Sequence, residues 1–101
     1  MAIAEVSIVP LGTGSPSIST HVARAISALQ QEKGVKHELT SMGTIIEGDL
    51  DSILQAVRRM HLATFGEGIL RVVTTIKIDD RRDKELTSQG KIESVLKKLE
   101  S

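Results

Sequence analysis

The chain has 101 residues, 40% of them hydrophobic, and its 13 basic and 13 acidic residues give a formal net charge of zero. This length predicts one domain spanning residues 1–101, and the balanced charge argues against electrostatic attraction to nucleic acid or to an anionic membrane. Cysteine is absent, which excludes disulfides, thiolate metal sites and cysteine nucleophiles.

The first part of the chain predicts a strand followed by a helix. Residues 3–9 alternate apolar and polar side chains, as a half-buried strand does. The turn-rich segment 11–17 follows, in which Ser15 is expected to be the N-cap of a helix and Pro16 its first residue. Apolar residues then recur at helical spacing until Gly34, which favours a helix end there.

The middle of the chain predicts a hairpin and a second helix. Residues 36–41 and 44–47 form two short runs so close in sequence that the strands must pair antiparallel. Asp49 is expected to be the N-cap of the next helix, which Gly66 and Gly68 would end.

The last part of the chain predicts a long strand and a final helix. In residues 69–79, Leu70, Val72 and Thr74 are expected to point to one face of a sheet. From about residue 87 to residue 100, apolar side chains recur at the spacing of one helix face, at Ile92, Val95, Leu96 and Leu99.

This order of elements predicts an α+β fold, the ferredoxin-like βαββαβ sandwich, with antiparallel sheet order 4-1-3-2 and an added C-terminal helix. Both main helices then lie on one face of the sheet. The other face is expected to carry Glu5, Ser7, Val9, Glu38, Ile45, Glu47, Arg71, Val73, Thr75 and Lys77. We expect that face to pack against a second copy in a symmetric homodimer. The C-terminal helix could instead cover it, or its apolar side chains could be scattered in solvent.

Signatures of catalysis are missing from the sequence, so binding without catalysis is expected. The Gly12–Ser15 stretch completes no phosphate-binding motif, and an acylphosphatase-like enzyme would need an arginine in this loop and an asparagine elsewhere. RNA binding on this fold needs aromatic residues on the sheet, and Phe65 is the only aromatic residue. His21, His37 and His61 lack metal-ligand spacing. The charged run 79–83 indicates a solvated or intersubunit salt-bridge segment.

One constellation of polar residues remains. If the first and third predicted strands pair antiparallel, the end of the first lies beside the start of the third. The candidate binding residues at that rim are the hydroxyls of Thr13, Ser15, Ser41 and Thr44, with the carboxylate of Glu47 farther along the strand. Such a set suits a neutral or cationic ligand rich in N–H donors. Alternatively, the hydroxyls cap turns, and Glu47 pairs with Arg71 or Lys77.

Three motifs, in residues 5–14, 37–48 and 71–81, resemble the thiamine-binding protein family of small ferredoxin-like proteins. The resemblance implies non-catalytic binding of thiamine or its hydroxymethylpyrimidine moiety, with no required cofactor, by a homo-oligomer that is typically a tetramer of two sheet-packed dimers. The implied pocket residues are Thr13, Thr44 and Glu47, with Ser15 and Ser41 as neighbours.

Two further expectations bear on function. Because there is a single aromatic residue, the apolar walls of a pocket would come from Leu11, Met42, Ile45 or a neighbouring subunit. The N-terminal segment lacks the basic and apolar regions of a signal peptide, and no stretch reaches the roughly 18 apolar residues of a membrane span, so a cytoplasmic location is expected. An oligomeric regulatory or scaffolding protein with an incidental pocket is the alternative function.

Overall fold

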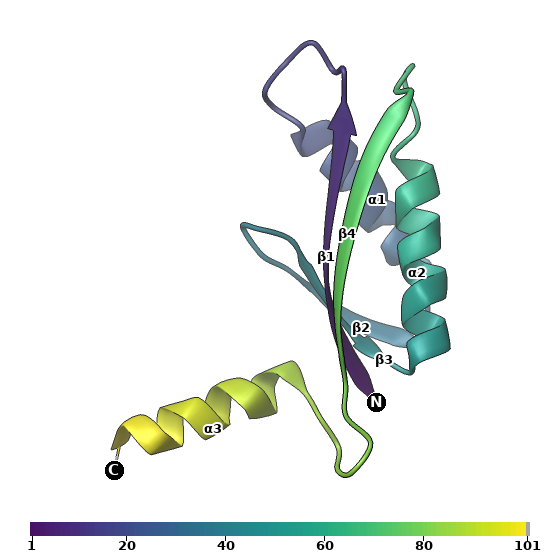
Figure 1. Cartoon of the computed structure of the whole chain (residues 1–101). Helices are drawn as coiled ribbons and strands as arrows, with labels where there is room; N and C mark the ends of the chain where they lie inside the picture. Colours follow the sequence, from purple (N-terminus) through teal and green to yellow (C-terminus); the bar gives the residue numbers. More distant parts are fainter. Residues whose placement is uncertain (101) are drawn as a thin grey trace.

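The computed structural model describes residues 1–100 and confirms the ferredoxin-like α+β fold (Figure 1). The four strands form one antiparallel sheet of order β2-β3-β1-β4. The elements in chain order are β1 (Ala2–Leu11), α1 (Ser19–Leu29), β2 (Val35–Leu39), β3 (Thr44–Gly48), α2 (Leu50–Ala63), β4 (Arg71–Asp80) and α3 (Ser88–Glu100).

The sheet has an inner face, covered by α1 and α2, and an outer face on the opposite side (Figure 1). β1 pairs with β4 along its whole length, from Ala2 opposite Asp80 to Leu11 opposite Arg71. Because side chains alternate along each strand, this register places on the outer face every residue that the sequence predicted there.

The hydrophobic core lies between the inner face and the two helices. Leu29 of α1, Ile46 of β3 and Ile53 of α2 are 0% exposed. The two helices also contact each other on this face of the sheet. The full cluster of buried residues is Ala2, Ala4, Val6, Ala25, Leu29, Ile46, Ile53, Ala56, Val57 and Met60. Small alanines on β1 allow the helices to lie close to the sheet, which gives the dense packing of protein interiors.

The predicted start of the first helix is wrong, because α1 begins at Ser19 and not at Pro16. The segment before it folds on itself: the Thr13 hydroxyl donates to the Ser15 carbonyl at 2.6 Å, and the Ser15 hydroxyl accepts from the Ser17 amide at 3.2 Å. The Ser15 side chain is therefore used inside the loop, and α1 has no side-chain N-cap.

The helix ends also differ from the sequence predictions. α1 ends at Leu29, well before Gly34, because the chain tightens into a turn in which the Gln31 amide donates to the Ala28 carbonyl. α2 ends at Ala63, ahead of Gly66 and Gly68, where the Thr64 hydroxyl donates back to the Met60 carbonyl at 2.8 Å.

The start of α2 is as predicted. Asp49 is the N-cap: one carboxylate oxygen accepts from the Ser52 amide at 2.9 Å, and the other accepts from the Ser52 hydroxyl at 2.8 Å. These hydrogen bonds, the backbone one first, lower the pKa of Asp49 below its ordinary value. The cap satisfies an amide that the helix cannot bond internally.

The expected orientation of Leu70 is wrong, since its side chain is 92% exposed while Ile69 is 7% exposed. The ladder between β1 and β4 begins at Arg71, opposite Leu11. Leu70 therefore lies before the paired part of the strand, where the alternation that the sequence suggested does not apply.

α3 projects away from the sheet (Figure 1) and has no buried residue. Its apolar residues Ile92, Val95, Leu96 and Leu99 are 51–75% exposed. The Cα radius of gyration is 15.2 Å, whereas a compact chain of this length has about 13 Å. Over residues 1–100, the structure contains no helix with the length and apolar character needed to cross a membrane.

Candidate functional site

A cavity of about 160 Å³, here called the hairpin cavity, lies between α1, β1 and the turn that joins β2 to β3. Its walls are mostly apolar, and Met60 of α2 and Thr64, just after the end of α2, also line it. A cavity of about 150 Å³ is large enough for one benzene molecule, so this one has room for a single six-membered ring. The apolar lining residues are Val6, Ile8, Val9, Ile18, Val22, Ala25, Ile26, Leu39, Met42 and Met60.

Gly43 brings the hairpin turn close enough to β1 to wall the cavity. A Cβ atom at this position would lie 2.8 Å from the Val6 carbonyl oxygen, which is too close for any side chain. The turn itself is held by Thr40, whose hydroxyl and amide both donate to the Gly43 carbonyl at 2.8 Å. The glycine and the threonine together place the side chains of Ser41 and Thr44 at the cavity.

The hydroxyls of Ser41 and Thr44 are the free polar groups on the hairpin side of the cavity. Thr44 is only 4% exposed and is paired through its backbone with Val6 on the inner face. Within residues 1–100, neither hydroxyl has a hydrogen-bond partner. A hydroxyl can donate or accept, so these two can bind a ring nitrogen or an amino group.

His21 of α1 faces the same cavity, and sequence reasoning did not select it as a binding residue. Its Nδ1 atom is buried and has no hydrogen-bond partner within residues 1–100. A signal was present: His21 lies three residues after Ile18 and four before Ala25, on the apolar stripe of the predicted helix. The absence of metal-ligand spacing among the histidines does not reveal that His21 lies on this apolar stripe.

Thr13 and Ser15 do not line the hairpin cavity. Thr44 pairs with Val6, so β1 continues five residues past that pair to Leu11, a distance of about 17 Å at the rise of an antiparallel strand. Figure 1 shows β1 running well beyond the hairpin. The predicted meeting of the 11–15 loop with the 41–44 turn is therefore wrong.

Glu47 lies on the opposite side of the sheet from Thr44, because residues three apart on a strand point to opposite faces. Its Oε1 atom accepts a hydrogen bond of 2.5 Å from the Ser88 amide at the first turn of α3. The expected pairing with Arg71 or Lys77 is not formed among the described residues. Glu47 therefore holds the start of α3, beside a small outer groove that Lys36, His37, Glu38, Ile45 and Ser88 also line.

Of the residues expected to form apolar walls, Met42 lines the hairpin cavity. Leu11 and Ile45 lie on the outer face instead. Phe65 is 39% exposed, and its ring contacts the His61 ring edge-on at a centroid distance of 5.4 Å. The His21 imidazole is thus the one planar ring among the lining residues.

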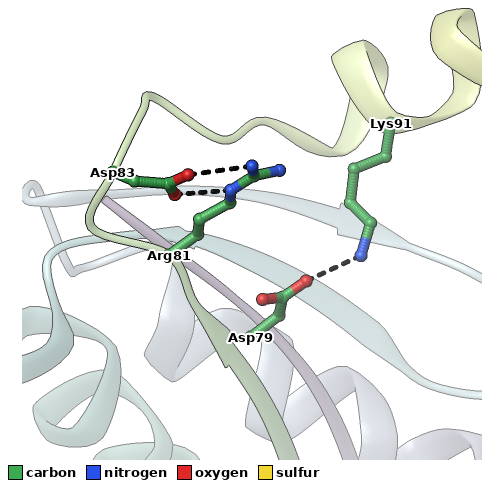
Figure 2. A network of polar contacts seen from close by, with 4 residues as sticks. All are labelled: Asp79, Arg81, Asp83 and Lys91. Carbon is green, nitrogen blue, oxygen red and sulfur yellow. Dashed lines mark hydrogen bonds and ion pairs between the residues drawn. The ribbon is translucent and has the colours of Figure 1, made fainter.

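The charged side chains of the run 79–83 form ion pairs with each other and with α3, some of which Figure 2 shows. Arg81 donates two hydrogen bonds to Asp83, at 2.6 and 3.0 Å, and Lys91 of α3 reaches Asp79 of β4 at 2.8 Å. The hydrogen bond from Arg81 lowers the pKa of Asp83, and the hydrogen bond from Arg82 lowers the pKa of Asp80. These exposed ion pairs fit the interpretation of the run as a solvated salt-bridge segment. Separately, residues 1–100 contain no cluster of side chains suited to a metal ion.

Fold and cavity together define a small ferredoxin-like α+β protein with a recess sized for one ring. The chain belongs to the thiamine-binding protein family, whose model matches residues 4–96. It is 47% identical to the UPF0045 protein YqgV of Bacillus subtilis, over 99% of each chain.

Solved structures show the same fold. The hypothetical protein MJ1052 of Methanocaldococcus jannaschii is similar with a TM-score of 0.85 and 42% identity, over 93% of this chain and 94% of that one. A Thermotoga maritima protein, named provisionally for thiamine biosynthesis or salvage, is similar in fold with a TM-score of 0.75 and 20% identity, over 93% and 97% of the two chains.

Proposed function

We propose that this protein binds thiamine or its hydroxymethylpyrimidine moiety in the hairpin cavity, without transforming it. The observation that carries the proposal is a cavity of about 160 Å³ in which buried Thr44 keeps its hydroxyl free. Membership of the thiamine-binding protein family supports the ligand class. The lining contains neither carboxylate nor cysteine, so His21 is the one candidate general base among the lining residues.

The cavity suits the pyrimidine part of the ligand better than the thiazolium part. Apolar side chains such as Met42 and Val22 can contact the faces and methyl group of a pyrimidine, while hydroxyls bind its polar edge. No acidic side chain lines the cavity to offset a thiazolium charge. In this arrangement the pyrimidine lies inside and the thiazolium lies at the mouth, in water, so both molecules bind with similar affinity.

The proposal extends to self-association, with a homodimer formed through the outer face and a homotetramer from two such dimers, in the cytoplasm. Two apolar surfaces of the chain have no cover: the outer face, where Val9 and Val73 are 37% and 45% exposed, and the stripe of α3. Full burial of each such side chain stabilises by roughly 1.5–3 kcal/mol. A second copy supplies matching surfaces for both, as two-fold symmetry requires.

Isothermal titration tests the ligand proposal. Wild-type protein is titrated with hydroxymethylpyrimidine and with thiamine, and the ligand is recovered and weighed by mass spectrometry. We expect saturable binding of both and recovery of unchanged ligand. Absence of heat at high micromolar protein, or recovery of a converted product, contradicts the proposal. Stable capture of a protein partner with no ligand bound would favour the regulatory or scaffolding alternative.

Multi-angle light scattering tests the assembly. The monomer has a mass of 10.9 kDa, and we expect twice or four times that mass at tens of micromolar. A monomer at that concentration contradicts packing through the outer face.

A further inference from the structure

We propose that His21 determines which ring the hairpin cavity accepts, and that it selects a six-membered nitrogen heterocycle carrying an amino group over the same ring without that group. This inference rests on the proposed function, because it assigns a role in the same cavity. It begins with the Nδ1 atom of His21, which is buried and has no partner within residues 1–100. A buried polar atom without a hydrogen bond destabilises the empty protein, so a ligand that bonds to it gains affinity.

The position of His21 gives the cavity two polar sides. His21 is on α1, whereas Ser41 and Thr44 belong to the hairpin on the other wall. Of the other polar residues in the lining, Thr40 bonds to Gly43 and Thr64 bonds to Met60, while Ser7 belongs to β1 and lies in the register of the outer face. A ring between the two walls therefore meets an imidazole on one side and free hydroxyls on the other.

The chemistry of a neutral imidazole sets the selectivity. One ring nitrogen donates a hydrogen bond and the other accepts one, and the ring is half-buried beside the cavity, so rotation about its Cβ–Cγ bond presents a nitrogen to the ligand. An aminopyrimidine offers an N–H donor next to a ring-nitrogen acceptor. Replacing the amino group by hydrogen removes that donor and leaves a buried polar group of the site unpaired, which binding sites reject strongly.

The test compares hydroxymethylpyrimidine with its analogue in which the amino group is replaced by hydrogen. Calorimetry on wild-type protein is expected to show at least tenfold tighter binding of the amino form. His21→Phe keeps a planar ring without nitrogens, so we expect it to weaken the amino form about tenfold and to abolish the preference. His21→Asn, which returns an amide near the position of Nδ1, is expected to recover part of both.

A matched control is His37→Phe, since His37 is an exposed residue of β2 outside the hairpin cavity, and it should change neither affinity nor preference. Thermal unfolding verifies that each variant is folded, and His21→Leu replaces the Phe variant if that one is not. If wild-type protein binds neither compound, the proposed function fails. If wild type binds but the His21 variants keep its affinity and preference, this inference alone is overturned.

Discussion

Both faces of the sheet carry apolar side chains, but the two sets differ in burial. On the inner face, Ala4 and Ile46 are 0% exposed, because α1 and α2 cover them. On the outer face, Val9 and Val73 stay 37% and 45% exposed, and the apolar stripe of α3 is 51–75% exposed. The same residue types are thus buried on one side of the sheet and exposed on the other. What differs is whether the chain itself supplies the covering layer.

The largest effect should distinguish a covered apolar side chain from an uncovered one, through two neighbouring residues of α2. Ile53 is 0% exposed and Leu54 is 42% exposed. Ile53→Ala leaves a cavity in the core and is expected to lower the free energy of unfolding by about 2–5 kcal/mol, whereas Leu54→Ala should cost a small fraction of that. Urea denaturation of both variants measures the difference. Equal losses would contradict the assignment of the core.

The next effect concerns the proposed dimer interface. Leu96, 52% exposed on α3, is replaced by glutamate. If a second copy covers this stripe, burying the charge raises the dimer dissociation constant by at least about 100-fold. Analytical ultracentrifugation measures the constant, and Lys97→Glu, on the same turn but off the stripe, is the control. An unchanged constant in Leu96→Glu would remove α3 from the interface.

A smaller effect should distinguish Thr44 from Glu47, the two strand residues that the sequence placed in one site. Thr44→Val keeps the shape of the side chain and removes the free hydroxyl, so hydroxymethylpyrimidine affinity should fall about five- to tenfold, the value of one hydrogen bond. Glu47→Gln should leave affinity within twofold. Instead, it should speed amide hydrogen exchange at Ser88, whose N–H the carboxylate accepts. Equal loss of affinity in both variants would indicate that Thr44 and Glu47 belong to one binding site.

The smallest effect is expected at Asp49, which caps α2 on the exposed edge of the inner layer. Its pKa is lowered in the folded protein, first by the Ser52 amide, so its ionised form stabilises the fold. That stabilisation is present above the ordinary aspartate pKa and is lost as pH falls through the lower folded value. Asp49→Asn should therefore unfold at a slightly lower temperature at neutral pH and match wild type in strong acid. A constant difference at all pH values would exclude the charge as the cause.

The sequence predicted the parts of the fold that depend on periodicity, and missed those that depend on register and local bonding. Alternation in residues 3–9 and helical spacing around Ile53 indicate strand and helix because burial acts on every turn of each. The start of α1 was misplaced because the Ser15 hydroxyl bonds to the Ser17 amide within the loop. The periodicity of a sequence does not indicate whether a serine hydroxyl bonds within a loop or caps a helix.

In the candidate site, too, the sequence predicted what motif and periodicity indicate and missed what depends on register and local bonding. Thr44 was found because its motif and strand position were visible, but the pairing of Thr44 with Val6 moved the 11–15 loop away from it. Glu47 was placed with Thr44 although three positions on a strand reverse the face. His21 was missed because a histidine on an apolar stripe shows its meaning only when a cavity and an unpaired nitrogen are seen beside it.

The most direct measurement is a titration of ¹⁵N-labelled protein with hydroxymethylpyrimidine, followed by amide chemical shifts. Binding in the hairpin cavity should move the amides of residues 18–26 and 39–44 most, with those around Ser88 nearly still. Shifts concentrated at Glu47 and Ser88, or in the loop around Thr13, would place the ligand elsewhere and contradict the account.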